Sequence, residues 1–403
     1  MDATLKEAYH AARQGATLLS EEVESWKQFS VPLDERVSLW QRGFLSRANA
    51  IYDFEEYDSR AYLSDYERYV KTRTINGAFG IALDNKLLFH HVLEGFDEHR
   101  PTLHGMIDGG RLRPIADGSG RTADGTTTNP DGSGPFSDRL RPIPDGSGSI
   151  VGEKNRSRTP DGPEAPTEPT LAIEWLEEEL SPGDRVVSKW VLGGGGHNVK
   201  VIERTGDGFT LNGSEFDRRE LAAELADVHD HLLTEFVEQA PYADELYPDA
   251  ANTIRLVTMR DPDSDEAFVG AAIHRVGTDD SAPMDNWTAG GLSAPIDRET
   301  GRMGTAIAYP AGEELVRHDF HPDTGAQIDG ATVTEWESIR ERVLEIADAL
   351  HYVSYAGWDL IVTEDGFRII EANNYPGVKS IQVHGPLMDD PRVQRFYEAH
   401  GVR

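Results

Sequence analysis

Residues 357–374, GWDLIVTEDGFRIIEANN, constrain the fold more than any other stretch of the chain. Two apolar runs flank a Glu-Asp-Gly turn at 364–366, a pattern that predicts a β-hairpin. Asp359 falls in the first strand, and Glu371 and Asn373 fall in the second. Because residues two apart in a strand point to the same face, we expect the hairpin to bring two carboxylates and an amide together.

Carboxylate and amide oxygens gathered in this way are typical of a magnesium site in which phosphates supply the remaining ligands. The alternative is a solvated acidic hairpin, which an acidic chain forms readily. Against that alternative, Asp359 and Glu371 stand among apolar residues, where a buried carboxylate is unfavourable unless a cation compensates it. The sequence therefore predicts that Asp359, Glu371 and Asn373 hold Mg²⁺, with Mn²⁺ as a second candidate ion.

A glycine run follows Lys189 between two predicted strands. Glycine lets backbone N–H groups approach phosphate oxygens, and the lysine can add positive charge. Taken alone, the run fits a flexible hairpin better, because it lacks the Gly-Lys-Ser/Thr of a P-loop. The run comprises Gly193, Gly194, Gly195 and Gly196.

Two arginines, Arg255 and Arg275, stand in otherwise apolar strands predicted at 251–259 and 267–276. A guanidinium in such a strand needs an anionic partner. That partner is either a phosphate or a structural carboxylate, and taken alone the carboxylate is favoured.

The chain divides by composition into four regions. Residues 1–115 are expected to be mainly helical, with helices at 33–51 and 84–93. Residues 116–169 are rich in Gly, Pro, Ser, Thr and Asp and are expected to form a flexible insertion. Mixed α/β structure follows, with a boundary near 240: residues 170–240 carry the glycine run, and 241–403 carry the hairpin and a helix expected at 334–350.

The charge balance is strongly negative. Asp and Glu number 71 against 39 Lys and Arg, for a formal net charge of −32. A surface of that sign repels nucleic acid and anionic membranes, and it is tolerated best at high salt, where screening is strong. With no cysteine, no signal-peptide pattern and no long apolar run, the sequence predicts a cytoplasmic, salt-adapted protein without nucleic acid or membrane insertion.

The order of these motifs resembles the ATP-grasp superfamily, most closely its sugar-transfer-associated family. The core is also similar to that of ribosomal-protein glutamate ligases. The resemblance rests on EANNYPG at 371–377, NWTAGG at 286–291, the two arginine strands and the glycine run, with softer matches in LDNK at 83–86 and HPDTG at 321–325.

This resemblance implies an α+β fold of the ATP-grasp type, in which two α/β subdomains grip ATP, preceded by a mainly helical region. It also implies an ATP- and Mg²⁺-dependent ligase that joins a carboxylate to an amine or thiol through an acylphosphate. The family description suggests a role in the biosynthesis of a cell-surface polysaccharide or sugar conjugate.

By resemblance, the phosphates contact Lys189, the glycine run and Lys86, and the metal is held by the hairpin. Arg275 and Asn286 stabilise the transferring phosphoryl group, and Arg255 holds the substrate carboxylate. A ribose-binding acid is expected where this chain has Gln239. The adenine hinge corresponds to Glu235, Phe236, Val237 and Glu238.

Two other functions use the same residues. An ATP-grasp kinase would pass the phosphoryl group to a hydroxyl, and a non-catalytic regulator would bind ATP without turnover. A purely structural acidic protein fits the charge but not the ordered motifs. We expect His318, His321 and His384 to be structural hydrogen-bonding residues, because a lone histidine in a turn usually is.

Overall fold

The computed structural model describes residues 3–115, 163–193, 198–312 and 314–403, with side chains from residue 14 onward. These residues form two compact units. Of the described residues, the larger unit contains 3–101, 237–312 and 314–403, and the smaller contains 102–115, 163–193 and 198–236. Each combines helices with an antiparallel sheet, so the predicted α+β class is confirmed. Most of the predicted flexible insertion lies outside the described residues, which resume at 163.

The smaller unit is built on one antiparallel sheet with the strand order β3-β2-β1-β8-β4-β5-β6-β7. Helices α6 (Ala172–Glu179) and α7 (Arg218–Ala226) pack on it through a shared apolar cluster. The strands are β1 (Leu103–Asp108), β2 (Arg111–Arg113), β3 (Thr170–Leu171), β4 (Arg185–Trp190), β5 (Val199–Arg204), β6 (Phe209–Leu211), β7 (Ser214–Phe216) and β8 (His231–Glu235).

Helix α7 lies between β7 and β8 and begins at a capping box. Asp217 accepts hydrogen bonds from the first turn, and Glu220 returns one to its backbone, so this capping box fixes the start of the helix. The preceding residues pair in β7, and His231 already begins β8.

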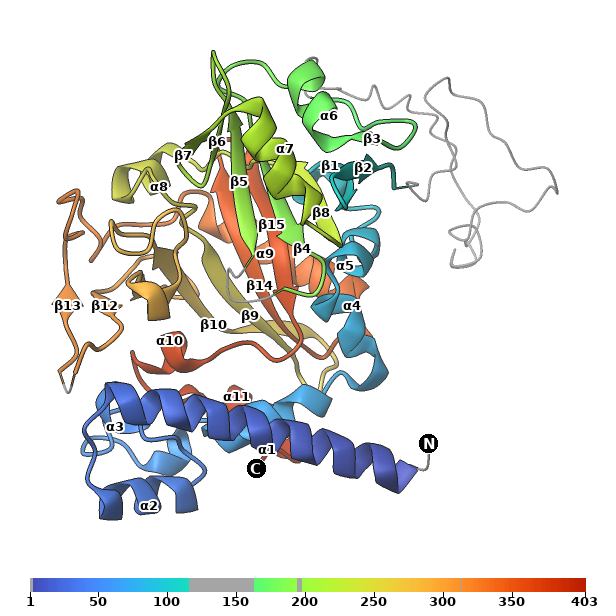
Figure 1. The fold of residues 1–403 in the computed structure, drawn as a ribbon. Helices are drawn as coiled ribbons and strands as arrows, with labels where there is room; N and C mark the ends of the chain where they lie inside the picture. The colour runs from blue at the N-terminus through green and yellow to red at the C-terminus, as the bar shows by residue number, and fades with distance from the viewer. Residues whose placement is uncertain (1–2, 116–162, 194–197, 313) are drawn as a thin grey trace, which may run out of the picture. The chain divides into compact units, whose positions relative to one another are not determined.

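The larger unit is built on a second antiparallel sheet, ordered β13-β12-β11-β10-β9-β14-β15 (Figure 1). The predicted hairpin is confirmed as β14 and β15, and the two arginine strands as β9 and β10. The strands are β9 (Ile254–Arg260), β10 (Ala267–Val276), β11 (Leu292–Pro295), β12 (Ala306–Ala308), β13 (Arg317–His318), β14 (Tyr355–Thr363) and β15 (Gly366–Asn373).

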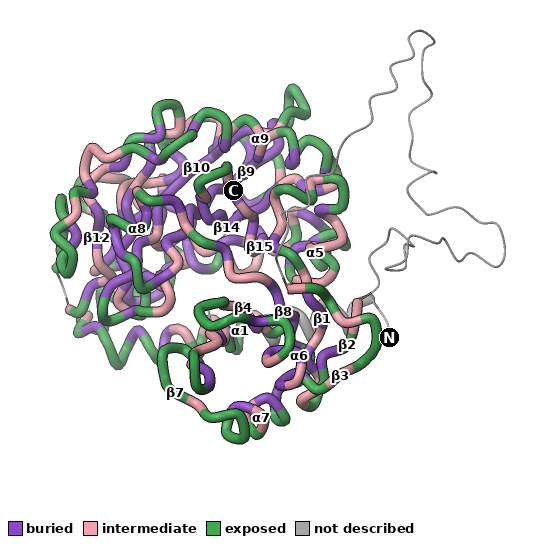
Figure 2. The backbone as a smooth tube through the Cα atoms, turned by 90° about the horizontal axis from the view of Figure 1, so that it is seen from above, coloured by how far each residue is buried: buried purple, intermediate pink, exposed green. Residues whose placement is uncertain are grey.

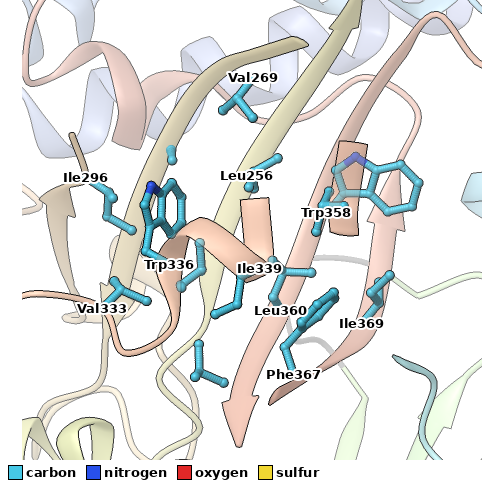
Figure 3. Packing of buried hydrophobic residues seen from close by; sticks show 14 of the residues in the cluster. Leu256, Val269, Ile296, Val333, Trp336, Ile339, Trp358, Leu360, Phe367 and Ile369 are labelled. Carbon is cyan, nitrogen blue, oxygen red and sulfur yellow. The ribbon is translucent and has the colours of Figure 1, made fainter. Parts of the chain in front are cut away.

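One face of this sheet is apolar and is covered by α9 (Trp336–Ala349), within the predicted range 334–350. Alternate residues of β9 and β14, such as Leu256 and Trp358, point to this face and contact Ile339 and its neighbours on the helix. Figure 3 shows this packing, in which the side chains of both strands meet those of α9. Helix α8 (Pro241–Leu246) joins the same cluster.

The opposite face is apolar at one end and charged at the other. Val257 and Met259 of β9 pack with α10 (Lys379–Gln382) and α11 (Pro391–Ala399). Arg255 lies on the same side of the strand, two residues before Val257. Figure 2 shows that β9 and β14 are buried along their length, so these charges lie within the fold and not on its surface.

The N-terminal region is mainly helical, as predicted, but its helices are shorter than the spacing suggested. The helix expected at 33–51 is divided because Gly43 adopts a φ of 86°, a left-handed conformation that ends a helix. The helix expected at 84–93 begins at Lys86, after the Asn85 cap. The helices are α1 (Ala3–Gln28), α2 (Leu33–Gln41), α3 (Ala48–Ile51), α4 (Ile81–Asp84) and α5 (Lys86–Val92). No helix among the described residues is long and apolar enough to cross a membrane.

Candidate active site

Three charged residues stand opposite one another on adjacent strands of the larger unit. Asp359 of β14 pairs with Arg255 of β9 on one side and with Glu371 of β15 on the other. Residues directly opposite in antiparallel strands share a face, and Asn373 follows Glu371 by two positions. The backbone thus places all three proposed metal ligands on one face. Opposite Asn373, Gly357 has no side chain, and a Cβ there would lie 2.5 Å from Pro376 Cβ.

Asp359 is enclosed by two guanidinium groups. Arg255 binds it through both oxygens, Nε to Oδ1 at 2.5 Å and Nη2 to Oδ2 at 2.9 Å, and Arg275 Nη2 lies 3.1 Å from Oδ2. Burial raises the pKa of Asp359, but the two arginines outweigh it and hold that pKa below its ordinary value. The side chain is therefore an anion whose charge is already balanced inside the protein.

Arg275 also connects this cluster to Asp285. Its Nε lies 3.6 Å from Asp285 Oδ2, and Nη2 donates to Thr253 Oγ1 at 2.5 Å. The Thr253 backbone N–H and hydroxyl both donate to Asp285. Burial raises the pKa of Asp285 even though Arg275 and Thr253 lower it. Arg275 thus lies between two carboxylates. Of the two partners considered from the sequence, a phosphate or a structural carboxylate, the carboxylate is present.

Lys86 contacts the proposed metal site from the N-terminal region. Its Nζ lies 3.3 Å from Glu371 Oε2, with side chains that are 10% and 21% exposed. The Asn85 side chain accepts hydrogen bonds from Leu87 N and Leu88 N, which fixes the start of α5 next to Lys86. The LDNK segment therefore lies at the EANNYPG segment, and a phosphate at this position would meet a cation.

The oxygen donors on this sheet face fit Mg²⁺. Among the described residues, no three His, Cys, Asp or Glu side chains are grouped as a metal site, so the candidate set is two carboxylates and an amide. Glu371 and Asn373 are partly exposed, and both offer hard oxygen donors. Because Mg²⁺ takes few protein ligands when phosphates supply the rest, this set fits, with Asp359 shared between the metal and its arginines.

Asn286 is held by the turn it begins. It caps a short 3₁₀ helix, Trp287–Ala289, and its Oδ1 accepts hydrogen bonds from Thr288 N at 3.1 Å and Thr288 Oγ1 at 3.0 Å. It directly follows Asp285, the partner of Arg275. The sequence reasoning missed Asp285, although its position next to the NWTAGG motif was a usable signal.

Several residues predicted to contact the nucleotide lie in the smaller unit. Lys189 is on β4, opposite Val199 and Leu232, and Gly193 follows that strand. Glu235 ends β8, and its backbone N–H donates to Thr102 O at 3.0 Å, so this N–H is used within the sheet. Phe236 carries the Arg185 guanidinium 3.8 Å from its ring centre. Gly194, Gly195 and Gly196 lie outside the described residues.

The hinge residues that follow belong to the larger unit. Val237 is buried and Glu238 is exposed. Gln239, which stands where a ribose-binding acid was expected, has a structural role: Nε2 donates to Tyr247 O and Ala250 O, both at 3.1 Å. Its Oε1 accepts from Asn252 N at 2.9 Å.

The segment after Asn373 is held by residues that the sequence reasoning missed. Asn76 donates to Asn374 Oδ1 at 2.8 Å across 298 positions, and Arg68 donates to Tyr375 O at 3.2 Å and Pro376 O at 3.3 Å. No spacing in the sequence connects such distant positions. Asn374 itself lies in EANNYPG, so the motif contained one half of the contact.

Two of the histidines set aside from the sequence make structural hydrogen bonds. His321 Nε2 contacts Gly277 O at 2.7 Å, and its Nδ1 accepts from Asp323 N at 3.2 Å. His384 Nε2 lies 3.0 Å from Ser293 Oγ, and burial lowers its pKa to about 3. His321 therefore joins two loops of the larger unit, and His384 joins the segment after α10 to strand β11.

Comparison with known proteins adds a family match. Residues 170–394 match the family described as sugar-transfer associated ATP-grasp. No curated protein matches the chain. Among solved structures, the D-alanine–D-alanine ligase from Coxiella burnetii has 12% identity and a TM-score of 0.32, covering 79% of this chain and 59% of that one.

Two further structures are similar at the same level. N5-carboxyaminoimidazole ribonucleotide synthetase from Thermotoga maritima has 12% identity and a TM-score of 0.29, covering 76% of this chain and 49% of that one. The biotin carboxylase domain of the Hydrogenobacter thermophilus 2-oxoglutarate carboxylase, solved with MgADP, ADP and bicarbonate, has 18% identity and a TM-score of 0.24, covering 53% and 39%. The chain spans less than two thirds of each of these three chains.

Proposed function

This chain belongs to the sugar-transfer-associated ATP-grasp family, and we propose that it is an ATP- and Mg²⁺-dependent ligase that joins a carboxylate to an amine or a thiol. The observation that carries the proposal is the row of charges on one sheet face, Arg255, Asp359 and Glu371, flanked by Arg275 and Lys86. Cations and hard oxygen donors alternate there, as phosphoryl transfer requires.

The proposed metal is held by Glu371, Asn373 and Asp359. When bound, Mg²⁺ would neutralise charge on the phosphates of ATP. Lys86, Lys189 and the glycine run Gly193–Gly196 supply further positive charge and backbone donors for the phosphates. The backbone of Glu235 to Glu238 holds the adenine.

Arg275 and Asn286 are assigned to the transferring phosphoryl group. Arg275 is held by Asp285 and Asp359, so its guanidinium is oriented before substrate arrives. Arg255 is bidentate on Asp359 and 8% exposed, so we propose that it positions Asp359 and does not bind the substrate carboxylate.

In the proposed reaction, a carboxylate oxygen of the acid attacks the γ-phosphorus of ATP, and the bond to the ADP oxygen breaks. The acylphosphate that forms is then attacked at its acyl carbon by the amine or thiol, and inorganic phosphate leaves. Neither step needs a nucleophilic side chain, because positioning and charge neutralisation supply the catalysis.

The test is a product analysis. The purified protein is incubated with ATP and Mg²⁺ in high salt, over a panel of amino acids and sugar acids with amine acceptors. A ligase gives equal amounts of ADP, inorganic phosphate and a condensed product. A phosphoester without free phosphate would instead identify a kinase, and ATP binding without turnover on any panel member would favour a regulator.

The setting is proposed from composition and from the family description. The net charge of −32 supports a salt-rich cytoplasm, where screening weakens repulsion between surface carboxylates. The family description supports a role in assembling a cell-surface polysaccharide or sugar conjugate.

A further inference from the structure

A second concentration of positive charge lies in the larger unit, directly after the EANNYPG segment. It comprises Arg47, Arg68 and Lys379, with the carboxylates Glu21 and Asp65 beside them. Arg47 binds both carboxylates, Nη1 to Glu21 Oε2 at 2.5 Å and Nη2 to Asp65 Oδ1 at 2.7 Å. The two anions of this cluster are therefore already paired with one of its three cations.

Arg68 and Lys379 have no such partner. Arg68 donates to backbone oxygens of Tyr375 and Pro376, and its guanidinium lies 4.2 Å from the ring centre of Tyr69. Within the described ranges, neither Arg68 nor Lys379 makes an ion pair with a carboxylate, and Lys379 makes no side-chain hydrogen bond. The chain has a net charge of −32, so carboxylates are abundant, yet these two cations pair with none of those described. This points to an anion from outside the chain.

The surroundings of Lys379 give the same indication. Burial lowers its pKa to about 8; the charges of Arg47 and Arg68 lower it too, while those of Glu21 and Asp65 raise it. The ammonium is thus held where its charge is disfavoured. A bound anion would relieve that state and raise the pKa again.

A small cavity adjoins these groups. Its volume is about 10 Å³, and its lining includes Arg68, Lys379 and Gly377 together with the ion pair of Arg47 and Asp65. Such a volume holds roughly one water-sized group. One oxygen of a carboxylate or phosphate could therefore enter beside the two cations.

We propose that Arg68 and Lys379 bind an anionic group, a carboxylate or a phosphate, that the acid substrate carries in addition to the carboxylate that is activated. Its assignment to the substrate rests on the proposed ligase function. Lys379 follows Asn373 by six residues, so the chain itself limits their separation to roughly 20 Å. A substrate with two anionic ends could thus engage both places.

Anion protection of Lys379 tests the site without ATP. The full chain is acetylated at pH 8 with acetic anhydride, and each lysine is quantified by mass spectrometry. An ordinary lysine has a pKa of about 10.4, so Lys379 should react faster. Succinate or inorganic phosphate at 10 mM, at ionic strength fixed with KCl, should slow Lys379 acetylation at least fivefold. Which of the two protects distinguishes a carboxylate site from a phosphate site.

The controls are internal. Lys27, which is 66% exposed, should acetylate at the same rate with and without the anions. R68Q should abolish protection of Lys379. R73Q, which removes a guanidinium 4.9 Å from the Tyr375 ring centre, should leave it intact. Three results would overturn the proposal: protection of Lys27 as strong as that of Lys379, no protection of Lys379 by either anion, or no reaction of Lys379 at all because no small molecule reaches it.

The result is separate from the test of ligase activity. Protection without any turnover would leave an anion site in a protein that is not a ligase. Turnover without protection would leave a ligase in which Lys379 does not bind an anion.

Discussion

At the scale of single residues, the centre of the larger unit is a chain of alternating charges. Asp285, Arg275, Asp359 and Arg255 follow one another, so each inner charge has neighbours of opposite sign. Removing one member of a buried ion cluster is more damaging than its net contribution suggests, because its partners remain buried without compensation.

Asp359→Asn should therefore destabilise the protein by about 3–5 kcal/mol, since two buried guanidiniums would lose their shared anion. Urea unfolding measures the effect. The control, Asp389→Asn, changes an exposed carboxylate of the same unit and should alter stability by less than about 0.5 kcal/mol. Equal stability of the two variants would show that the arginines do not depend on Asp359.

The stabilisation that Asp359 gains from its two arginines depends on pH in a defined way. Because the folded pKa of Asp359 is below its ordinary value of 3.8, its stabilisation is complete above that value and is lost as pH falls through the folded pKa. The stability difference between wild type and Asp359→Asn should thus be constant from pH 5 to 7 and shrink below about pH 4. Asp285, whose pKa is raised, is present in both proteins. A difference that instead grew on acidification would contradict this assignment.

Glu371→Gln tests the proposed metal site. Loss of one carboxylate charge should lower Mg²⁺-dependent turnover at least about 100-fold, equivalent to about 2.7 kcal/mol in the barrier. Glu364→Gln makes the same change at the exposed hairpin turn and should leave turnover within about twofold. Steady-state ADP release measures both. Full activity in Glu371→Gln would remove this carboxylate from the catalytic machinery.

At the scale of elements, helix α9 shows how local spacing determines packing. Ile339, Val343 and Ile346 recur at intervals of three and four, and all are buried against the sheet. Ile339→Ala should lower the free energy of unfolding by about 2–4 kcal/mol through the cavity it leaves. Glu341→Ala, on the exposed side of the helix, should change it by less than about 0.5 kcal/mol. A similar loss of unfolding free energy in both variants would mean that α9 does not bury the face that carries Ile339.

Comparing the predicted elements with those of the structure shows what the sequence could predict. The hairpin, the two arginine strands and α9 were found because period 2 and period 3.6 are local properties of the chain. Helix ends were less well predicted: the break at Gly43 and the start after the Asn85 cap depend on single residues, which an average over the segment hides.

The candidate site was predictable only in part. The shared face of Asp359, Glu371 and Asn373 follows from strand alternation, so sequence spacing was sufficient. The bidentate contact of Arg255 with Asp359 depends on which strands are neighbours, and that is a property of the whole sheet. The contact of Asn76 with Asn374 joins two loops far apart in sequence, where no local pattern exists.

At the scale of the whole molecule, the excess of 32 negative charges sets the conditions under which the fold is stable. Raising KCl from 0.1 to 1 M shortens the screening length from about 10 to about 3 Å. The thermal midpoint should then rise by several degrees, as repulsion between surface carboxylates weakens. Sucrose of equal osmolality serves as the uncharged control. A midpoint that stayed level or fell with KCl would contradict salt adaptation.

The contacts of Lys86, Asn76 and Arg68 with positions 371–377 have a practical consequence. A graft that transferred only residues 170–394 to another protein would leave behind the cation beside Glu371, the amide that holds Asn374 and the guanidinium that fixes the proline turn. The recipient would carry every residue of the recognisable motif in a loop without its supports. The first hundred residues thus supply contacts to this motif that any engineered hybrid must keep.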